Sequence, residues 1–378
     1  MIFRDIETPC LLLDRAKLRA NILAMHQRMA ELGVNLRPHG KTAKNIDVMR
    51  LALAGQRGGI TVSTLKEAEY YFENGVEDIV YAVGIAPVKL ERVAKLMQAG
   101  ASVTLLLDSL EQAEILARAG QQMQLCFPAL IELDCDDHRS GVRADDPLLL
   151  EIAQLLHHSA GTQMRGVLTH AGGSYDCRST GELQQMAQRE RDAAVQAAVN
   201  LQAADLPCPV VSVGSTPTAT FATDLDGVTE VRAGVFQFQD LVMAGLGVCK
   251  VEDIAVSVLT SVIGHQPQKN WILIDAGWMA LSRDRGTSAQ KIDQGYGLVC
   301  AADGTVYPDL IVSGTNQEHG IISQRNGGGI VMSEFPVGTQ LRILPNHACA
   351  TTAMFDRYTL IPESNSAQPT HWHRVNGW

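Results

Sequence analysis

The stretch Arg37-Pro38-His39-Gly40-Lys41-Thr42 lies where an apolar run through Val34 and Leu36 ends and a new helical segment begins. A lysine at the carboxyl end of a buried strand, beside an arginine and a histidine, is held in a crowded, cationic and partly dry position. That setting lowers the cost of a neutral amine, which attacks carbonyl groups. One interpretation is therefore that Lys41 forms a Schiff base with pyridoxal phosphate. The alternative is a solvated lysine in a surface loop, which the hexapeptide alone favours because most lysines at strand ends are solvated.

Around this stretch, the chain repeats a short apolar strand followed by an amphipathic helix, at intervals of roughly two dozen residues. The predicted strands are 11–13, 34–37, 60–63, 79–83, 103–107, 130–133, 166–169, 210–213 and 228–232. This alternation is typical of an α/β fold, and it predicts a (β/α)8 barrel of the TIM type, which carries its functional residues at the carboxyl ends of its strands. The nine predicted strands are one too many for that barrel.

The alternation stops after about Gly245. The strands predicted beyond this point have turns but hardly any helix between them, and they are 255–263, 271–275, 298–300, 310–312, 329–332, 340–344 and 358–361. This pattern predicts a separate β domain in the last third of the chain.

Glycines and hydroxyl residues follow the last two predicted barrel strands, in Gly214-Ser215-Thr216 and in Gly234-Val235. Backbone amides of these segments, with the hydroxyl groups of Ser215 and Thr216, can surround a phosphate without a full positive charge. Glycine lets the backbone approach such a ligand closely. We therefore expect Ser215, Thr216, Gly234 and Val235 to bind the phosphate group of the cofactor.

Two side chains at other strand ends suit the flat ring of the cofactor. His170 offers a stacking face, and the guanidinium of Arg139 is a suitable partner for the phenolic oxygen. The alternatives are a core histidine bonded to a backbone carbonyl, and a surface ion pair of Arg139 with Asp136 or Asp137. The functional interpretation is favoured because five such segments, with that of Lys41, follow strands of one array.

Composition excludes several classes of partner. The chain has 378 residues, of which 46% are hydrophobic and 19% charged, as in an ordinary globular enzyme. Its formal charge of -10 argues against nucleic acid or an anionic membrane as the partner, because both are polyanions. We find no signal-peptide core and no window long and apolar enough for a membrane span, and expect a cytoplasmic protein. The eight cysteines lack C-x-x-C spacing, which fits reduced thiols.

Taken together, four segments resemble the metal-activated branch of the alanine-racemase-like, fold-type III pyridoxal phosphate enzymes, which holds D-threonine aldolases and dehydratases of D-serine and of hydroxyaspartate. The segments are RPHGKT (37–42), THAG (169–172), SVGSTP (212–217) and PNHAC (345–349). The resemblance implies a cofactor-binding barrel of the alanine racemase type at 15–245 and a β domain at 246–378 that includes 1–14. The strand 11–13 then belongs to the β domain. It also implies a homodimer in which the β domain of one subunit helps to close the active site of the other.

A second chemical feature lies in the last of these segments, which contains His347 and Cys349. Ligands at i and i+2 project to the same side of an extended strand, and an imidazole with a thiolate suits zinc, manganese, cobalt or nickel with open positions for water. The alternative is a stray histidine beside a buried thiol. The resemblance favours a metal site at His347 and Cys349. It also favours dehydration over aldol cleavage, because the dehydratases of the family carry His with Cys at this place, whereas the corresponding pair of the aldolases looks like His with Asp.

The resemblance implies a dehydratase that converts a β-hydroxy D-amino acid, such as D-threo-3-hydroxyaspartate or D-serine, into a 2-oxo acid and ammonia. Lys41 then acts as general base at the α-carbon, and the metal polarises the β-hydroxyl group. Tyr175 and the turn 316–319 are further candidates near the metal, with turns that bond to themselves as the alternative.

Two arginines are candidates for binding a substrate β-carboxylate, namely Arg283 and Arg285. The alternative for either is an ion pair with Asp284. Asp275 begins the same region, and we assign it a structural role.

Three other functions stay open. A D-threonine aldolase would release glycine and an aldehyde. An amino-acid racemase needs a second base on the opposite face of the ring and no metal. A non-catalytic pyridoxal phosphate carrier would be a single barrel, whereas this chain has a tail domain.

Overall fold

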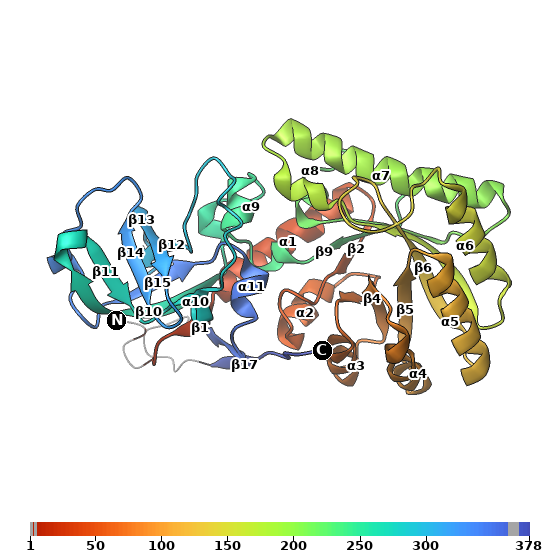
Figure 1. Cartoon of the computed structure of the whole chain (residues 1–378), viewed down its shortest axis with the longest axis horizontal. Helices are drawn as coiled ribbons and strands as arrows, with labels where there is room; N and C mark the ends of the chain where they lie inside the picture. Colours follow the sequence, from red (N-terminus) through yellow and green to blue (C-terminus); the bar gives the residue numbers. More distant parts are fainter. Residues whose placement is uncertain (1–2, 4–5, 362–369) are drawn as a thin grey trace. The chain divides into compact units, whose positions relative to one another are not determined.

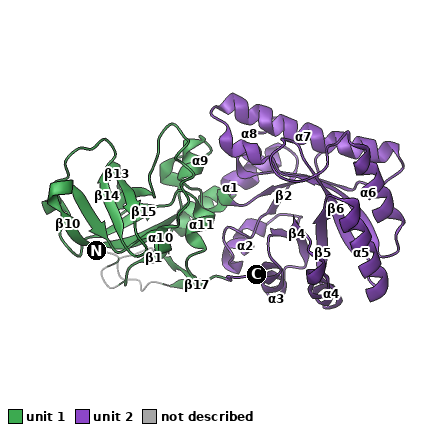
Figure 2. Ribbon diagram, viewed as in Figure 1, with its two compact units in different colours: residues 1–22, 235–374 green, residues 23–234, 375–378 purple. Residues whose placement is uncertain are grey.

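The computed structural model describes residues 3, 6–361 and 370–378. The described chain forms two compact units (Figures 1 and 2). The β unit consists of Met1–Ile22 and Val235–Arg374, and the barrel unit consists of Leu23–Gly234 and Val375–Trp378.

The barrel unit contains a parallel sheet of eight strands in the order β2-β9-β8-β7-β6-β5-β4-β3. The strands are β2 (Asn35–Pro38), β3 (Ile60–Val62), β4 (Asp78–Gly84), β5 (Ser102–Leu107), β6 (Phe127–Leu133), β7 (Thr162–Thr169), β8 (Val210–Val213) and β9 (Glu230–Ala233). The bridge between His39 and Thr61 joins the two ends of this order, and Gly40 N–H donates to Thr61 O at 2.8 Å. The predicted (β/α)8 barrel is therefore confirmed.

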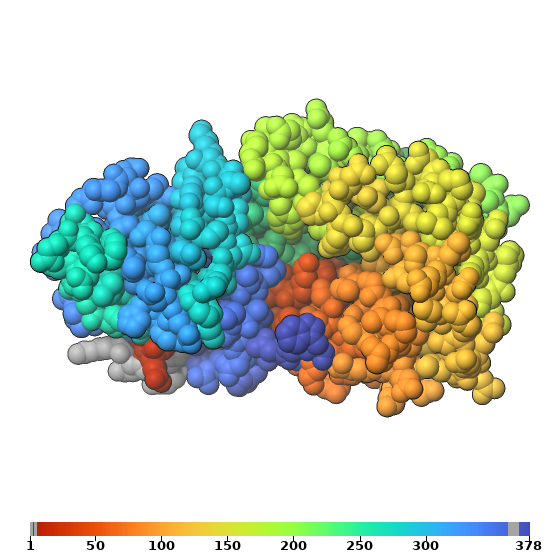
Figure 3. All heavy atoms as spheres, viewed as in Figure 1, coloured from red at the N-terminus to blue at the C-terminus, as the bar shows by residue number. Residues whose placement is uncertain are grey.

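Helices alternate with these strands, as the periodicity predicts. They are α1 (Arg15–Glu31), α2 (Ile46–Leu53), α3 (Leu65–Glu73), α4 (Leu90–Gln98), α5 (Leu110–Met123), α6 (Pro147–His158), α7 (Thr180–Ala203) and α8 (Thr216–Phe221). Hydroxyl side chains begin several of them, since Thr64, Ser109 and Ser179 accept a hydrogen bond from the amide three residues on. Atoms of the helical segments, coloured orange, yellow and light green, form the visible face of the barrel unit (Figure 3).

Several strands, covered by helices outside and filled by side chains inside, bury apolar residues on both faces. One buried cluster takes a residue from each of four neighbouring strands, namely Val80, Leu106, Leu130 and Leu168. At about 25 cal/mol per Å² of buried apolar surface, such layers supply the main driving force for closing the sheet. Among the described residues, no helix combines the length and the apolar character that crossing a membrane requires.

The β unit contains a sheet of nine strands in the order β11-β14-β13-β12-β15-β10-β1-β16-β17, in which β11 also pairs with β10. The strands are β1 (Cys10–Leu13), β10 (Val256–Gln266), β11 (Trp271–Ile274), β12 (Leu298–Ala301), β13 (Val306–Thr315), β14 (Gly320–Gln324), β15 (Gln340–Leu344), β16 (Arg357–Leu360) and β17 (His371–His373). β1 pairs antiparallel with β10 and parallel with β16. The predicted placement of 11–13 in the β domain is therefore confirmed, which explains the surplus strand.

Two details of the predicted β domain differ. The strand predicted at 329–332 is wrong: the chain there leads into the 3-10 turn η6 (Met332–Glu334), after a run of glycines in which Gly327 has a φ of +72°. β14 and β17 were missed because neither GIISQ nor HWH shows a clear apolar alternation.

The boundaries of the two units differ from those of the predicted domains. The prediction placed 15–245 in the barrel and 246–378 with 1–14 in the β domain, whereas the units change at 22/23, 234/235 and 374/375. The first turns of α1 belong to the β unit because Asn21 Nδ2 donates to the carbonyls of Gln237 and Asp253, at 3.3 and 2.9 Å. The segment from Val235 joins the β unit because Leu241 and Val242 donate to Pro345 and Asn346 at 3.1 Å. The assignment of the cofactor and metal to these domains stays a prediction.

Candidate active site

Lys41 lies in the turn after β2. Gly40 before it packs closely, since a Cβ there would lie 2.6 Å from the Tyr71 ring. Thr42 and Ala43 after it are buried, but Lys41 itself is exposed. We expected a partly dry amine, and the structure differs because only the neighbours of Lys41 in the turn are packed.

Two imidazoles share the cationic surroundings of Lys41. Burial, and then the charges of Lys41 and Arg232, hold the pKa of His39 well below its usual value. Burial also lowers the pKa of His170 to about 4, although its bond to Gly214 opposes the shift. The charges of Lys41, Arg232 and Arg139 act on His170 in the same direction as burial. Both rings are therefore neutral near pH 7, and the positive charges around them favour an anionic ligand.

His170 directly follows β7, and its Nδ1 lies 2.9 Å from the carbonyl oxygen of Gly214. Because a carbonyl only accepts, Nδ1 of the neutral ring carries the proton and Nε2 does not. The carbonyl bond that we gave as the structural alternative thus exists, and it fixes the plane of the ring.

Arg139 lies in the loop after β6, with 63% of its side chain exposed. Its Nη2 lies 3.2 Å from Oε1 of the buried Glu132. The alternative pairing with Asp136 or Asp137 is wrong: Asp137 pairs with Arg143. Because its charge lowers the pKa of His170, Arg139 belongs to the same group of strand-end residues.

The predicted phosphate segments follow β8 and β9. Ser215 caps α8: its Oγ accepts from Thr218 N–H at 3.2 Å and also bonds to Ser174 Oγ at 3.0 Å. Thr216 is the first residue of α8, and both residues are buried. The hydroxyl and the amide of Ser215 therefore both have partners within the protein.

Two glycines bring the backbone close at these strand ends. Gly214 has a φ of +133°, and a Cβ there would lie 2.3 Å from Arg232 O. A Cβ on Gly234 would lie 2.9 Å from Thr42 Oγ1 and 3.1 Å from His39 Cβ. Val235 follows as a buried residue that begins the turn η3 (Val235–Gln237). With an amine, two neutral imidazoles and nearby cations, these strand ends fit pyridoxal phosphate.

Tyr175 lies in the turn η2 (Gly172–Asp176), with 37% of its surface exposed. Asp136 holds the start of this turn, since its Oδ2 accepts from Gly173 N–H at 2.7 Å. The loops after β6 and β7 are thereby tied together. Tyr175 is thus placed on the same side of the barrel as His170, and its chemical role stays a prediction.

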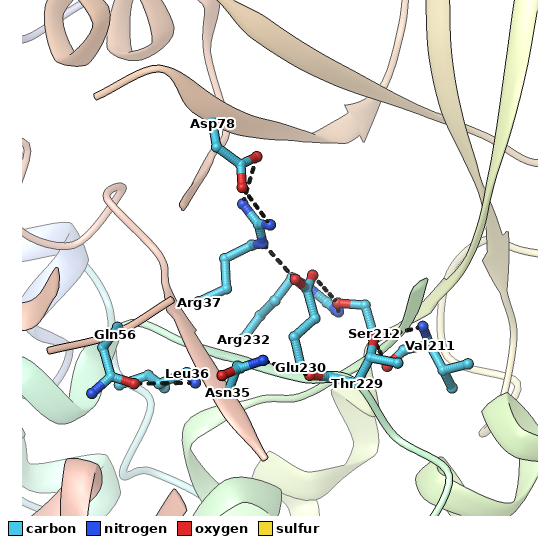
Figure 4. A network of polar contacts seen from close by, with 10 residues as sticks. All are labelled: Asn35, Leu36, Arg37, Gln56, Asp78, Val211, Ser212, Thr229, Glu230 and Arg232. Atoms are coloured by element: carbon cyan, nitrogen blue, oxygen red, sulfur yellow. Dashed lines mark hydrogen bonds and ion pairs between the residues drawn. The ribbon is translucent and has the colours of Figure 1, made fainter. Parts of the chain in front are cut away.

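Sequence reasoning missed the charged residues inside the barrel. Arg37 lies between two carboxylates (Figure 4): its Nε donates to Glu230 at 2.7 Å, and its two other nitrogens donate to Asp78 at 3.0 and 3.1 Å. Arg232 donates to Ser212 Oγ and to Thr169 O, both at 2.6 Å, and Ser212 in turn donates to Glu230. Burial lowers the pKa of Arg232 to about 10. The spacing of Glu230 and Arg232, two apart on one strand, is the signal that could have revealed this network.

In the β unit, the segment with His347 and Cys349 is not the extended strand that we predicted. β15 ends at Leu344, and Cys349 lies in the short helix α11 (Ala348–Thr352), of which His347 is the N-cap. The buried carboxylate of Asp240 accepts Ala348 N–H at 2.9 Å, which stabilises the start of the helix. His347 and Cys349 are nevertheless close, because their side chains are hydrogen-bonded to one another.

Asp284 is the second carboxylate at this place. Its Oδ2 lies 2.6 Å from Nδ1 of His347, and this hydrogen bond holds the pKa of Asp284 below its usual range. Burial disfavours a charged His347, but Asp284, Cys349 and Asp240 outweigh it and raise the pKa of His347 to about 11. These anionic surroundings favour a cation.

The donor set of an imidazole and a thiol fits a borderline-soft divalent metal. With Nδ1 of His347 bound to Asp284, Nε2 is the nitrogen that can bind a metal. Within 3, 6–361 and 370–378, no three His, Cys, Asp or Glu side chains are arranged to hold an ion. A metal bound by His347 and Cys349 would keep open positions, as metals in catalytic sites do.

The remaining candidates of the β unit have defined partners. Arg285 pairs with Asp293 at 2.6 Å, and the Arg283 guanidinium lies over the Trp278 ring at 4.4 Å. The alternative that either pairs with Asp284 is wrong, because His347 occupies that carboxylate. In the turn 316–319, Asn316 N–H donates to His319 O at 2.7 Å, so the turn bonds to itself as the alternative held.

Asp275 accepts hydrogen bonds from Thr8, Thr260 and the Ser261 amide at 2.5 to 2.8 Å. These contacts join the segment before β1 and the residue after β11 to β10. They agree with the structural role that we assigned to Asp275.

Comparison with known protein families gives two matches. The family described as alanine racemase, N-terminal domain, matches residues 13–241. The family described as putative serine dehydratase domain matches residues 255–361.

Curated relatives match along nearly the whole chain. D-threo-3-hydroxyaspartate dehydratase of Delftia sp. (strain HT23) is 52% identical, over 99% of this chain and 98% of the relative. D-serine dehydratase of Dictyostelium discoideum is 31% identical, over 97% and 98%. A D-threonine aldolase of Arthrobacter sp is more distant, at 26% identity over 94% and 89%.

Among solved structures, that of the Delftia sp. HT23 dehydratase matches with a TM-score of 0.97 and 51% identity, over 100% of this chain and 99% of the other. A cysteine-to-alanine variant of a D-threo-3-hydroxyaspartate dehydratase, solved in a metal-free form, matches equally well, with a TM-score of 0.97.

Proposed function

The chain belongs to the alanine-racemase-like family of dehydratases that act on D-amino acids, and from that premise we propose that its substrate is a β-hydroxy D-amino acid with a β-carboxylate. The products are a 2-oxo acid and ammonia. Enzymes of this family depend on pyridoxal phosphate, and this chain is a lyase of the carbon–oxygen type. The substrate that fits best is D-threo-3-hydroxyaspartate, with D-serine next.

The observation that carries the cofactor assignment is the cationic group of Lys41, Arg139 and Arg232 at the barrel strand ends, beside His170, whose pKa burial and then these charges lower to about 4. When bound, pyridoxal phosphate delocalises the negative charge that develops on the substrate α-carbon. Lys41 would supply the amine for the cofactor aldehyde and, as general base, would accept the α-proton at Nζ. His170 would offer a neutral imidazole to the ring, and Arg139 would offer a guanidinium to the phenolic oxygen.

The phosphate group would be held by the segments 214–216 and 234–235, with the backbone amides of Gly234 and Val235 as candidate donors, since those of Gly214 and Ser215 donate to Glu190 and Thr218. The close packing of these segments requires Gly214 and Gly234, because a Cβ at either position would collide with protein atoms. Ser215 is the N-cap of α8 and Thr216 its first residue, and the positive end of a helix dipole favours an anion.

His347 Nε2 and the Cys349 thiolate would hold a divalent ion, with zinc, manganese, cobalt and nickel as candidates. Such an ion supplies Lewis acidity toward the β-hydroxyl group. Asp284 keeps the His347 ring in the tautomer that presents Nε2. Tyr175 is a candidate to hand a proton to the leaving hydroxyl group, as a phenol can donate.

For the β-carboxylate, Arg283 is a better candidate than Arg285. Arg285 is already paired with Asp293, whereas Arg283 stacks on Trp278 and is exposed. A guanidinium with free N–H groups can bind a carboxylate with two hydrogen bonds. Arg283→Ala should therefore raise the KM for hydroxyaspartate more than the KM for serine.

The deciding experiment is a product assay with D-threo-3-hydroxyaspartate, D-serine and D-threonine, each with and without added divalent metal. We expect a 2-oxo acid and ammonia from the first two, and loss of turnover after treatment with EDTA. Glycine and acetaldehyde from D-threonine as the main products would instead mean an aldolase.

Two further outcomes would replace the proposal. Inversion of an amino acid without metal would identify a racemase, and a coloured protein with no turnover on any of the three substrates would identify a carrier.

A homodimer also belongs to the proposal, and a molar mass near twice that of the chain in light scattering would support it.

A further inference from the structure

Glu190 is a buried carboxylate in the middle of α7, a helix whose other charged residues contact solvent. Its side chain is 1% exposed. A carboxylate in such a place is costly unless hydrogen bonds and charges compensate for the lost water. The groups that provide these hydrogen bonds and charges show which parts of the barrel Glu190 contacts.

One oxygen of Glu190 joins two strand-end loops. Oε1 accepts from Ala171 N–H at 2.8 Å and from Gly214 N–H at 3.1 Å. Ala171 follows β7 and Gly214 follows β8, so the two amides come from loops that lie more than forty residues apart in the chain. Without this oxygen, two buried amides would lose their acceptor.

The two loops are the ones that carry the proposed ring and phosphate contacts. Ala171 is the residue after His170, and Gly214 is the residue before Ser215. Gly214 is held on both sides: its N–H donates to Glu190, and its carbonyl oxygen accepts from His170 Nδ1 at 2.9 Å. A third tie, between Ser174 Oγ and Ser215 Oγ at 3.0 Å, joins the same loops.

Charge also favours this position for Glu190. Burial raises its pKa, but hydrogen bonds from Thr218 and the two amides, together with the charge of Arg232, stabilise the carboxylate. Arg232 itself donates to Thr169 O, directly before His170. Glu190 and Arg232 thus bond to the backbone on either side of His170, Glu190 at the Ala171 amide and Arg232 at the Thr169 carbonyl.

We propose that Glu190 is a positioning residue for the cofactor site, which sets the tilt of the His170 ring against the phosphate loop through Ala171 and Gly214. The inference rests on the proposed function, since it assigns Glu190 a task toward pyridoxal phosphate. Glu190 does not touch the reacting atoms. It bonds to the two loops that we assign to the ring and the phosphate of the cofactor.

The test compares Glu190→Gln with Glu151→Gln, an exposed carboxylate on α6 that serves as matched control. Glutamine keeps an acceptor oxygen but removes the charge. We expect Glu190→Gln to weaken the binding of pyridoxal phosphate about tenfold, because hydrogen bonds to a charged acceptor are the stronger ones. The visible circular dichroism of the bound cofactor should fall, while E151Q leaves both unchanged.

A double-mutant cycle with His170→Gln separates positioning from a merely structural role. If Glu190 acts through His170, the loss of cofactor affinity in E190Q/H170Q is less than the sum of the two single losses. Additive losses, or a lower melting temperature of E190Q with unchanged affinity and dichroism, would overturn the inference. Should E190Q not fold, E190D keeps the charge but retracts it from the two amides, and the same readouts apply.

Failure of this inference is distinguishable from failure of the proposed function. If the wild-type protein binds no pyridoxal phosphate, the proposed function is wrong. If the wild type binds it and turns over substrate, and E190Q behaves alike, only the role of Glu190 is wrong.

Discussion

His170 in the barrel unit and His347 in the β unit carry the same side chain in opposite electrostatic surroundings. Burial and nearby cations lower the pKa of His170 to about 4, whereas carboxylates and a thiol raise that of His347 to about 11. Both rings bond through Nδ1, His170 to a carbonyl and His347 to a carboxylate. The partner of Nδ1 and the sign of the nearby charges therefore decide whether a histidine belongs to an anion site or to a cation site.

The two regions also differ in how they are assembled. The strand-end group of the barrel collects residues from successive strands, each placed by the same repeated architecture. The group around His347 gathers Asp240, Asp284 and the segment 347–349 from a sheet with long connections. Substitutions in the first region should affect the cofactor, and substitutions in the second should affect the metal alone.

The largest effect is expected at Lys41. Lys41→Ala removes the only amine that we assign to the cofactor aldehyde, so the visible absorbance of the covalently bound cofactor should disappear and turnover should fall by about a thousandfold or more. Absorption spectra and a product assay measure both. Lys66→Ala, at an exposed lysine of α3, is the control. A K41A protein that keeps its colour would show that another lysine binds the cofactor.

Cys349→Ala should separate the two regions. We expect the bound metal to be lost and turnover to fall by about a hundredfold, because Lewis-acid help is worth several kcal/mol. The cofactor absorbance should persist. Metal analysis and spectra of the same sample check this, with C126A, at an exposed thiol, as control. If C349A lost the cofactor together with the metal, the proposed independence of the regions would be refuted.

Asp284→Asn tests whether the partner of His347 matters for metal affinity. The amide can donate to Nδ1 and so favour the wrong tautomer, and loss of such a partner typically weakens metal binding about 10- to 100-fold. Titration with Co²⁺, followed by its visible spectrum, gives the dissociation constant. D309N, at an exposed carboxylate of β13, should match the wild type. Equal affinities for D284N and D309N would count against a role of Asp284.

A pH dependence of stability is expected in the protein freed of cofactor, and it concerns folding and not turnover. Because the pKa of His170 is lowered from 6.5 to about 4, the unfolded chain binds the extra proton between these values. The contribution of this group is thus present above pH 6.5 and is lost as the pH falls toward 4, by about 3 kcal/mol at most. Urea unfolding of wild type and His170→Gln at several pH values measures it. Parallel curves for the two proteins would mean that His170 is not the group responsible.

Local sequence was enough to predict the barrel. Its strands are short apolar runs at regular intervals, and the helices between them carry their own capping residues, so each element follows from neighbours in the chain. The position of Lys41 after β2 and the polar ends of the other strands follow from the same repeat. Topology then brings these ends together, because parallel strands of a barrel all end on one side.

The partners that tune these residues could not be found in this way. Glu190 lies on α7 among residues of a polar helix, and only packing shows that it accepts from Ala171 and Gly214. Likewise, Arg139 has acidic neighbours in the sequence, yet it pairs with Glu132 on β6. An ion pair depends on distance in space, and the sequence offers several candidates of equal merit.

The segment of His347 and Cys349 shows both sides of this contrast. The pair of ligand types, two residues apart, is legible in the chain, and it pointed to a metal without any structure. Its conformation could not be predicted, because a run of small residues can form a strand or a helix. Here the buried carboxylate of Asp240 accepts the Ala348 amide and stabilises the helix. The sequence alone determines that an imidazole and a thiol stand two residues apart. The backbone conformation of this segment and the charge of His347 depend on carboxylates that folding brings from more than sixty positions away.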